Sequence, residues 1–412
     1  MTAATHAPPA PRRAARPDER GGALVIGGNF PALGVVRSLG RRGIPVWALH
    51  DEYLLSARSR FARRGVPWPA DADEAGQRDY LLGLAAAHEL DGWTIFPTTD
   101  EAAAMLAREH DALAERFRLI TPPWEVVRWA HDKRLTHQLA GDADVPAPAT
   151  RYPRSRADVA GFDGAFPAVV KPVNSERFNR LTHAKAWQVD DHQALLARYD
   201  EACALIGVDQ VMVQELIPGG GEAQFSYVAL CDGGRPLASL VARRTRQYPL
   251  EFGRTSTYVE TIERPEVEDL ARRVLAALSY TGVAEVEFKY DRRDGRHKLL
   301  DINARNWAWH TLARRAGVDF PYLAWRLAHG EPVAEVRARP GVHWVRAVTD
   351  LRAVAVQLRR GDLSFPAYLR SLCGPAEYAM FAVDDPLPAV LDIPLLVIAW
   401  AQRARGKRRL AP

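Results

Sequence analysis

The sequence has few cysteines, no long apolar run and no strong excess of either charge. Its 412 residues include 3 cysteines, Cys203, Cys231 and Cys373, which form no CxxC pair and no zinc spacing. An odd count argues against a disulfide framework, so we expect a cytoplasmic location, where thiols stay reduced. No apolar run reaches the ~20 residues that span a bilayer. The first 20 residues lack the apolar segment of a secretory signal.

Charge and composition exclude further classes. Lysine and arginine number 55, aspartate and glutamate 50, and the formal net charge of +5 does not indicate a nucleic-acid partner. Hydrophobic residues make up 47% and charged residues 25%, which excludes a wholly disordered chain, a collagen and a coiled-coil rod. Basic residues gather at both ends of the chain, where like charges usually form solvated tails. We expect residues 1–20 to be a disordered tail.

Residues 21–122 alternate between short apolar runs and helical spacing. The runs at 23–28, 44–49, 93–96 and 117–120 predict strands, and residues 31–41, 80–88 and 101–115 predict helices. Strands that alternate with helices indicate a parallel α/β sheet. Asp100 is the expected N-cap of the last of these helices.

The pattern changes after residue 122. Residues 166–171 predict a strand. Short strands with turn residues between them predict an antiparallel sheet at 211–217, 225–230 and 237–242, and a hairpin is predicted at 283–303. The last eighty or so residues predict helices and loops. Within them, the apolar run Ile393–Ala401 precedes a basic tail and suits a core helix, an oligomer contact or an interfacial helix.

A glycine-rich turn, Gly27–Gly34, joins the first strand to the first helix. Such a turn directs backbone N–H groups toward an anion, and Asp51 lies near the place of the ribose-binding acid in a dinucleotide fold. However, the spacing differs from GxGxxG, and Pro31 suits a first helical turn for structural reasons. A structural turn is therefore favoured, with a substrate contact and NAD(P) binding left open.

Lysines and carboxylates form a second candidate site. Lys171 ends an apolar strand, where a lysine is costly unless it meets an anion. Glu287 shares a strand face with Glu285, and Asp301 shares one with Asn303. Pairing of the two strands brings Glu287 beside Asp301 and Asn303, a set of oxygen ligands that suits Mg²⁺. A solvated hairpin face is the alternative interpretation of the same alternation.

The order of the motifs resembles the ATP-grasp superfamily. The motifs are Val170-Lys-Pro172, Val213-Gln-Glu-Leu-Ile-Pro-Gly219, Val286-Glu-Phe288 and Leu300-Asp-Ile-Asn-Ala-Arg305. A more specific likeness, to the ATP-dependent carboligases or carboxylate–amine ligases, rests on Pro97-Thr-Thr-Asp-Glu101, the segment 246–253 and Asn306-Trp-Ala-Trp-His310. The resemblance covers about residues 22–330.

The resemblance implies a fold of mixed α/β and α+β class. Its expected parts are a Rossmann-like preliminary domain at 21–122, an ATP-grasp domain at 123–330 with a small lid subdomain at about 145–215, and a helical C-terminal extension at 331–412.

Matching positions imply the roles of individual residues. The resemblance implies that Lys133 and Lys171 contact the phosphates of ATP, that Gln214, Glu215, Leu216 and Ile217 form the hinge at the adenine, with Glu215 near its amino group, and that Glu222 holds the ribose. It also implies that Glu287, Asp301 and Asn303 are ligands of Mg²⁺ or Mn²⁺. Arg305 is implied to be the catalytic arginine that contacts the acyl phosphate. Two departures stand out: Asp301 replaces the usual Glu, and the loop 174–180 is not glycine-rich, so Ser175 and Lys185 become candidate phosphate contacts.

Substrate contacts are suggested by residue chemistry. Arg243 and Arg246 suit a carboxylate or phosphate, Ser256 offers a hydroxyl, and His310 is a candidate base. An exposed arginine-rich strand end is the alternative interpretation.

The activity implied is an ATP- and Mg²⁺-dependent ligase that joins a carboxylate, activated as an acyl phosphate, to an amine, with amino acids or peptide-like molecules as substrates and release of ADP and phosphate. A carboxylase-type or thiol ligase of the same fold and an NAD(P)-binding oxidoreductase are the alternatives. Expected partners are these small molecules and no nucleic acid; a homodimer and a peripheral membrane contact through the C-terminal segment are left open.

Overall fold

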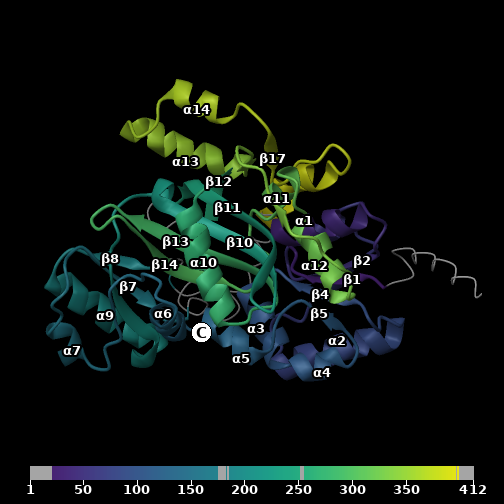
Figure 1. The fold of residues 1–412 in the computed structure, drawn as a ribbon, viewed down its shortest axis with the longest axis horizontal. Coiled ribbons are helices and arrows are strands. Elements are labelled where there is room, and N and C mark those ends of the chain that lie inside the picture. Colours follow the sequence, from purple (N-terminus) through teal and green to yellow (C-terminus); the bar gives the residue numbers. More distant parts are fainter. Residues whose placement is uncertain (1–20, 175–181, 183–184, 251–254, 396, 399–412) are drawn as a thin grey trace, which may run out of the picture.

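Three β-sheets organise the protein (Figure 1). The structure is a computed structural model, and it describes residues 21–174, 182, 185–250, 255–395 and 397–398. The predicted tail at 1–20, Ser175 and the rest of the segment 175–181, and part of the segment 246–253 lie outside the described residues.

The first sheet is parallel and has five strands in the order β3-β2-β1-β4-β5. Its strands are β1 (Ala23–Ile26), β2 (Val46–His50), β3 (Arg64–Pro67), β4 (Thr94–Pro97) and β5 (Arg118–Leu119). Its helices are α1 (Phe30–Gly40), η2 (Ser56–Arg58), α2 (Glu74–His88), α3 (Asp100–Arg108) and α4 (His110–Ala114). The parallel sheet predicted for this part of the chain is confirmed, although β3 was not predicted.

The cap of α3 differs from the prediction. Thr99 is the N-cap, and its hydroxyl accepts a hydrogen bond of 3.2 Å from the backbone N–H of Ala102. Asp100 is the first helical residue, so its prediction as the N-cap was wrong. Its carboxylate is thereby free to point away from the helix toward the neighbouring sheet.

The central sheet has eight strands in the order β14-β13-β10-β11-β12-β16-β17, with β15 paired to β11. Its strands are β10 (Gln224–Asp232), β11 (Arg235–Tyr248), β12 (Thr255–Ile262), β13 (Gly282–Asp291), β14 (Arg296–Asn303), β15 (Val336–Arg337), β16 (His343–Val345) and β17 (Ala376–Tyr378). The helices around it are α5 (Trp124–His131), α6 (Lys133–Asp142), α10 (Pro265–Ala277), α11 (Thr311–Arg315) and α12 (Phe320–Ala328). Strands β10 to β14 pair antiparallel, as predicted.

A small antiparallel sheet stands beside the central one (Figure 1). Its order is β6-β9-β7-β8, with β6 (Thr150–Arg151), β7 (Ala168–Pro172), β8 (Trp187–Val189) and β9 (Val211–Glu215). Helices α7 (Arg156–Ala160) and α9 (His192–Ile206) pack on it, and the short turns η3 (Val208–Gln210) and η4 (Gly221–Ala223) flank β9.

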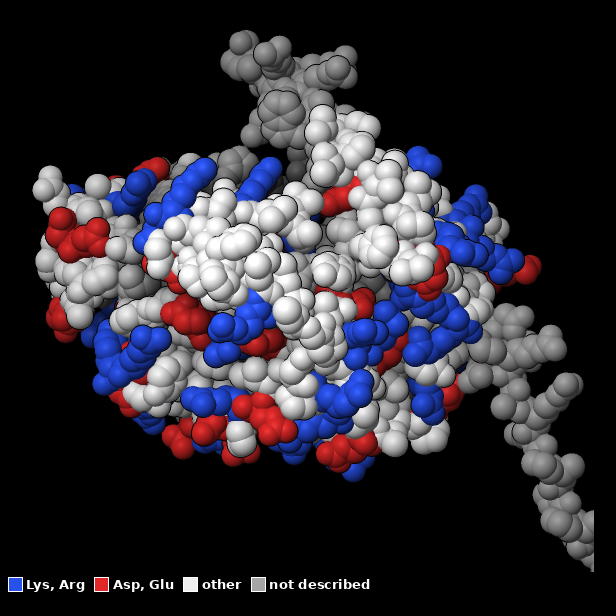
Figure 2. Space-filling view, turned by 90° about the horizontal axis from the view of Figure 1, so that it is seen from above, with Lys and Arg blue, Asp and Glu red and all other residues white. Residues whose placement is uncertain are grey.

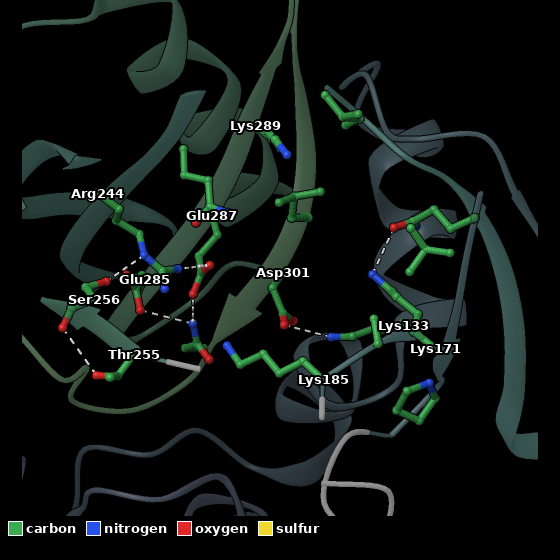
Figure 3. Close-up of a pocket in the computed structure, with 18 of the residues that line it drawn as sticks. Lys133, Lys171, Lys185, Arg244, Thr255, Ser256, Glu285, Glu287, Lys289 and Asp301 are labelled. Atoms are coloured by element: carbon green, nitrogen blue, oxygen red, sulfur yellow. Dashed lines mark hydrogen bonds and ion pairs between the residues drawn. The ribbon is translucent and has the colours of Figure 1, made fainter. Parts of the chain in front are cut away.

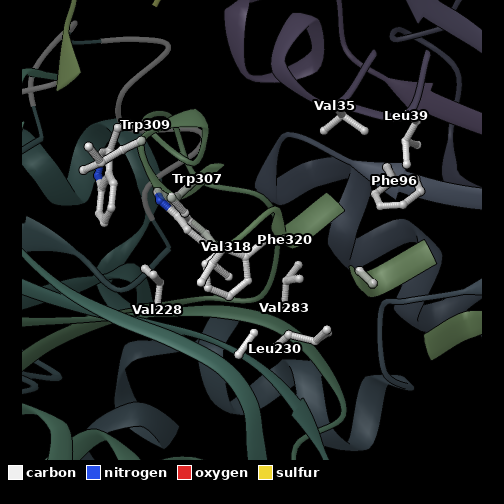
Figure 4. Packing of buried hydrophobic residues seen from close by; sticks show 14 of the residues in the cluster. Val35, Leu39, Phe96, Val228, Leu230, Val283, Trp307, Trp309, Val318 and Phe320 are labelled. Atoms are coloured by element: carbon white, nitrogen blue, oxygen red, sulfur yellow. The ribbon is translucent and has the colours of Figure 1, made fainter. Parts of the chain in front are cut away.

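The largest hydrophobic core joins the first sheet to the central one (Figure 4). Val35, Leu39 and Phe96 belong to the first sheet and its helix α1. Trp307 and Phe320 pack between them and the central sheet, and both are fully buried. The segment that follows β14 therefore packs between the two sheets, and this packing fixes the position of the first sheet relative to the end of β14.

The C-terminal segment is not only helical. Helices α13 (Ala347–Arg360) and α14 (Phe365–Ser371) cover one end of the central sheet, and residues 387–395 are helical. The same segment also contributes the strands β15, β16 and β17 to the central sheet, so the prediction of a purely helical extension at 331–412 was too simple. In the part of the chain that the structure describes, no helix is long and apolar enough to cross a membrane.

Candidate active site

A cavity of about 370 Å³ lies between the small sheet and the central sheet. Its floor is formed by β13 and β14, and the opposite wall by β7 and β9 (Figure 3). The segments that reach it from the first part of the chain are α6 and the start of α3. Its size falls in the usual range for small-molecule sites, about 300–1,000 Å³. Acidic side chains lie on its floor, and lysines project from its other sides (Figure 3).

The acidic groups come from directly opposed positions of one hairpin. Glu287 of β13 stands opposite Asp301 of β14, and Glu285 stands opposite Asn303. The side-chain amide of Asn303 donates hydrogen bonds of 3.0 Å to Glu285 and 3.0 Å to Glu287. The predicted gathering of Glu287, Asp301 and Asn303 on one face of a hairpin is thus present in the structure.

Three lysines face this acidic floor. Lys133, at the start of α6, donates to Asp301 Oδ2 at 2.7 Å. Lys171, near the end of β7, donates to the side-chain oxygen of Gln214 at 2.9 Å. Burial and the neighbouring Lys133 lower the pKa of Lys171 to about 7. Lys185 lines the same cavity, and its amino group points toward the acidic floor (Figure 3).

The hinge between the two sheets lines the cavity with Gln214, Glu215, Leu216 and Ile217. However, the carboxylate of Glu215 accepts hydrogen bonds from Lys298 at 2.9 Å, from Arg293 at 2.7 Å and from the backbone of Ala149 at 3.0 Å. Burial opposes ionisation, but these donors lower the pKa of Glu215. The carboxylate of Glu215 is therefore already bound by groups of the protein itself.

Glu222 lies at the edge of the site and does not line the cavity. It is exposed in η4, and its Oε1 accepts a 3.0 Å hydrogen bond from the backbone N–H of Gly220. Gln224 and Lys289, which the sequence analysis did not select, line this end of the cavity instead. They are opposite each other in the register of β10 and β13, so period-two counting from Glu287 would have found Lys289.

Arg305 lines the cavity and is held by a residue of the first part of the chain. Its Nε and Nη2 donate to the two carboxylate oxygens of Asp100 at 2.6 and 3.0 Å, and Nη2 also donates to Asn303 Oδ1 at 3.2 Å. Burial lowers the pKa of this guanidinium, but attraction to Asp100 outweighs burial and raises it above the ordinary value. The two-pronged head of Arg305 therefore stands beside the hairpin, fully charged.

Glu285 is the most deeply placed acid of the site. It is 3% exposed, and its Oε1 has no hydrogen-bond partner. Burial, reinforced by the nearby Glu287, raises the pKa of Glu285 to about 7. Burial also opposes ionisation of Glu287, yet the adjacent Arg244 lowers the pKa of that carboxyl. The two glutamates thus differ in pKa because their neighbours differ: the pKa of Glu285 is raised, and that of Glu287 is lowered.

Of Arg243, Arg244 and Arg246, only Arg244 lines the cavity, whereas the sequence analysis selected the other two. Its Nε donates to Ser256 Oγ at 2.8 Å, and its Nη1 pairs with Glu287. It is 6% exposed, so its contacts hold it in place beside the acidic floor. Ser256, which the sequence analysis selected, lines the cavity with Thr255.

Three residues predicted to contact substrate lie elsewhere, so these predictions are corrected. Arg243 points away from the cavity and pairs with Glu260 at 2.5 Å. Arg246 is buried against α13, where it pairs with Asp350 at 2.8 Å. His310 is 2% exposed, and its Nε2 donates to the carbonyl of Pro31 at 2.9 Å, which ties the start of α1 to α11.

The glycine-rich turn Gly27–Gly34 is filled by the protein's own atoms. A Cβ at Gly28 would lie 1.6 Å from the carbonyl oxygen of Tyr53, and one at Gly34 would lie 2.6 Å from the ring of His310. These glycines are therefore required by close packing, as a structural turn predicts.

The donor set of the floor suits a hard divalent cation. Two carboxylates and one amide oxygen are the ligands that Mg²⁺ prefers, together with phosphate oxygens. Among the described residues, no group of three or more His, Cys, Asp or Glu side chains has the arrangement of a metal site. The fit therefore depends on Asn303 as the third ligand, and on a cation that replaces the lysine and arginine contacts of Asp301 and Glu287.

The fold of the protein has counterparts in solved structures. An L-amino acid ligase from Bacillus licheniformis is matched with a TM-score of 0.57 at 18% identity, over 75% of this chain and 74% of that one. The biotin carboxylase domain of the 2-oxoglutarate carboxylase of Hydrogenobacter thermophilus, in complex with MgADP and bicarbonate, is matched with a TM-score of 0.62 at 16% identity, over 78% of this chain and 73% of that one.

Sequence comparison agrees with this structural likeness and makes it more specific. Residues 208–351 match the family described as ATP-grasp in the biosynthetic pathway with Ter operon. A D-aspartate ligase of Enterococcus faecium is 23% identical over 219 residues, which are 50% of this chain and 51% of that protein. The chain therefore spans about half the length of this relative. The protein has the ATP-grasp fold, and the resemblance inferred from its motifs is confirmed.

Proposed function

We propose that the protein is an ATP- and Mg²⁺-dependent ligase that activates a carboxylate as an acyl phosphate and joins it to an amine, with release of ADP and phosphate. One observation carries the proposal: lysines 133, 171 and 185 face Glu287, Asp301 and Asn303 across a single cavity, with Arg305 at its side. Cations opposite oxygen ligands are what a metal-bound triphosphate requires. The names of the relatives, D-aspartate ligase and L-amino acid ligase, agree with this activity.

The lysines would bind the phosphates. Lys171 is a buried cation whose pKa burial lowers, so an anion beside it restores its charge at little cost. Lys133 now neutralises Asp301 and would move its contact to a phosphate oxygen when a divalent cation takes its place. The hinge backbone at 214–217 would contact the adenine, and Glu222 or the neighbouring Gln224 would lie nearest the ribose.

Glu287, Asp301 and Asn303 would hold Mg²⁺, with Mn²⁺ as a substitute. When bound, the ion would supply positive charge that offsets the negative charge of the phosphate groups. Asp301 is one methylene shorter than glutamate, so the hairpin has to bring its carboxylate close. Its position directly opposite Glu287 in the β13–β14 register meets that need.

The chemistry needs positioned charge and no nucleophilic side chain. A carboxylate is a poor electrophile, and phosphorylation gives it a good leaving group that the amine displaces. Arg305 offers a rigid fork of donors to the oxygen on which negative charge grows. For the substrates, Arg244 with Ser256 suits a carboxylate, and the unpaired oxygen of Glu285 suits an ammonium group. An amino acid carries both groups, which favours amino acids or peptide-like molecules.

The proposal extends to the domains and the location. We assign residues 21–122 to a Rossmann-like domain, 123–330 to the ATP-grasp domain with a lid at about 145–215, and 331–412 to a C-terminal extension. A cytoplasmic location agrees with the cysteines, which are unpaired at Cys203, Cys231 and Cys373.

The test is a screen of carboxylates paired with amines, scored by ADP release and by the mass of the product. D- and L-amino acids, D-aspartate among them, form the first panel. Bicarbonate and thiol acceptors form separate arms, because a carboxylase-type or thiol ligase has the same fold. Hydroxylamine traps an acyl phosphate as a hydroxamate, so no hydroxamate with a competent acid would reject the acyl-phosphate route.

A thermal shift experiment separates the oxidoreductase alternative. MgATP raises the melting temperature of a ligase, whereas NAD(P) does so for a dehydrogenase. The tightly packed turn at Gly28 and Gly34 favours the first outcome.

A further inference from the structure

Among the described residues, the large hydrophobic side chains that are exposed fall in one segment. These side chains lie between positions 351 and 398. Phe365 is 58% exposed, Val383 86%, Val390 70% and Ile393 56%. Contiguous exposed apolar surface on a monomeric protein usually marks an interaction site. We call the exposed side chains of residues 351–398 the C-terminal face; it includes α13 and α14, which lie at the top of Figure 1 and face the viewer in Figure 2.

Most acids at or beside this segment have partners within the protein, whereas Asp362 is exposed on the turn after α13. Glu377 pairs with Arg314, Asp384 with Arg41 and Asp385 with Arg37. Asp350 pairs with the buried Arg246, and Asp392 accepts a hydrogen bond from Tyr53. These carboxylates add little negative charge to the C-terminal face, because internal partners neutralise or bind them.

The basic residues of the same segment point outward. Arg352, Arg359 and Arg370 are exposed on α13 and α14. Figure 2 shows broad uncharged areas on this side of the molecule, bordered by lysine and arginine side chains and by some acidic ones. In the sequence, the segment is followed by five more basic residues, at positions 403, 405, 407, 408 and 409. The face thus combines apolar surface with positive charge.

We propose that the C-terminal face binds the surface of an anionic lipid membrane. Exposed apolar side chains would enter the boundary between headgroups and acyl chains, and the arginines would lie against anionic headgroups. The contact lies on the membrane and does not cross it, since the described helices are too short or too polar to span one. A symmetric pair of copies is disfavoured, because it would place the arginines of one face against those of the other.

The proposal is independent of the ligase activity, because binding is measured without substrates. The full chain is sedimented with phosphatidylglycerol vesicles and, separately, with phosphatidylcholine vesicles. We expect binding to the anionic vesicles alone, and its loss at about 1 M salt, where screening leaves a Debye length of about 3 Å. Arg359→Glu with Arg370→Glu should raise the lipid concentration needed for half-binding at least tenfold, since each arginine contributes about fivefold. Phe365→Ser with Val390→Ser should weaken binding to a similar degree.

A matched control keeps the charge change and moves it elsewhere. Arg235→Glu with Arg296→Glu alters net charge by the same amount at the exposed first residues of β11 and β14, and should leave vesicle binding unchanged. Each variant is first checked for a wild-type melting temperature and its shift with MgATP. Failure of the wild type to bind anionic vesicles would overturn the proposal. So would equal loss of binding in the control, or a dimer by light scattering that Phe365→Ser with Val390→Ser converts to a monomer.

Discussion

Asp100 holds Arg305 by two parallel hydrogen bonds of 2.6 and 3.0 Å, although the two residues are 205 positions apart. The carboxylate comes from the helix that follows β4 of the first sheet, and the guanidinium comes from the end of β14. Carboxylate and phosphate groups bind such a fork in the same two-pronged way. A substrate oxygen that approaches Arg305 therefore competes with Asp100, and the first sheet takes part in setting the geometry of the site.

Arg305→Lys keeps the positive charge and loses the fork. We expect turnover to fall by about 10²–10³, as when one oxyanion donor is removed, while ATP affinity stays near that of the wild type. Steady-state ADP release and equilibrium nucleotide binding measure the two effects. Arg243→Lys is the control, because that guanidinium pairs with Glu260 outside the cavity. Weaker ATP binding with full saturated turnover would make Arg305 a nucleotide contact instead.

Asp301→Asn removes one charge from the acidic floor and keeps the shape of the side chain. If Glu287, Asp301 and Asn303 hold the metal, ADP formation should be abolished while the melting temperature stays close to that of the wild type. Asp232→Asn, at the exposed end of β10, is the matched control. Near-normal turnover in Asp301→Asn would reject the metal assignment.

We expect nucleotide binding to be coupled to protonation of the Lys171 side chain. Burial and Lys133 lower its pKa to about 7, so it is mostly neutral at pH 8, and phosphate beside it should restore the charge. ATP binding at pH 8 should therefore take up a proton, seen as different calorimetric heats in buffers of different ionisation enthalpy. In Lys171→Met the uptake should disappear and affinity should drop at least tenfold, roughly 1.4 kcal/mol. Equal heats for the wild type in both buffers would contradict this role.

Glu285 should make stability depend on pH. Its pKa is raised to about 7 in the folded protein, compared with about 4.3 in an unfolded chain, so the folded state holds a proton between these values. The contribution of Glu285 to the free energy of unfolding is fully present below about pH 4.3, and it is lost as the pH rises through about 7. Glu285→Gln should therefore raise the melting temperature at pH 8 and change it little at pH 4. A difference that is the same at both pH values would show that the carboxyl titrates normally.

Asp350 is the buried partner that fixes α13 to the central sheet. It accepts two hydrogen bonds from Arg246 at 2.9 and 2.8 Å and is 1% exposed. Asp350→Ala leaves a buried guanidinium without its charge partner, which typically costs about 3–5 kcal/mol. Urea unfolding should show this loss, while Asp362→Ala on the exposed turn after α13 should show almost none.

Local patterns were sufficient for much of the site. Alternation along β13 and β14 predicted that Glu287, Asp301 and Asn303 share a face, because strands have a period of two and a hairpin fixes their register. The same reasoning placed Lys171 at the end of a buried strand, where it lines the cavity. These predictions needed contacts within one hairpin or one strand.

The incorrect site predictions arose where the two-residue alternation of a strand is interrupted, or where residues far apart in the sequence are in contact. The register of β11 shifts between Arg243 and Arg246, so counting along the strand does not show that Arg244 alone of the three reaches the cavity. The contact between Asp100 and Arg305 crosses two sheets and leaves no local pattern. Glu215 matched its motif, yet donors from the hairpin beyond it occupy its carboxylate.

The salt bridge between Asp385 and Arg37 cannot form until late in the synthesis of the chain. The two residues are 348 positions apart, and Asp385 also accepts from Ser59, so the end of the chain completes the surface of its beginning. At about 5–20 residues per second, the ribosome needs roughly 17–70 s between the two codons. Throughout that interval the emerging first sheet carries Arg37 without its carboxylate and α1 without the segment that covers it. The surface around Arg37 is thus completed only after Asp385 has been synthesised.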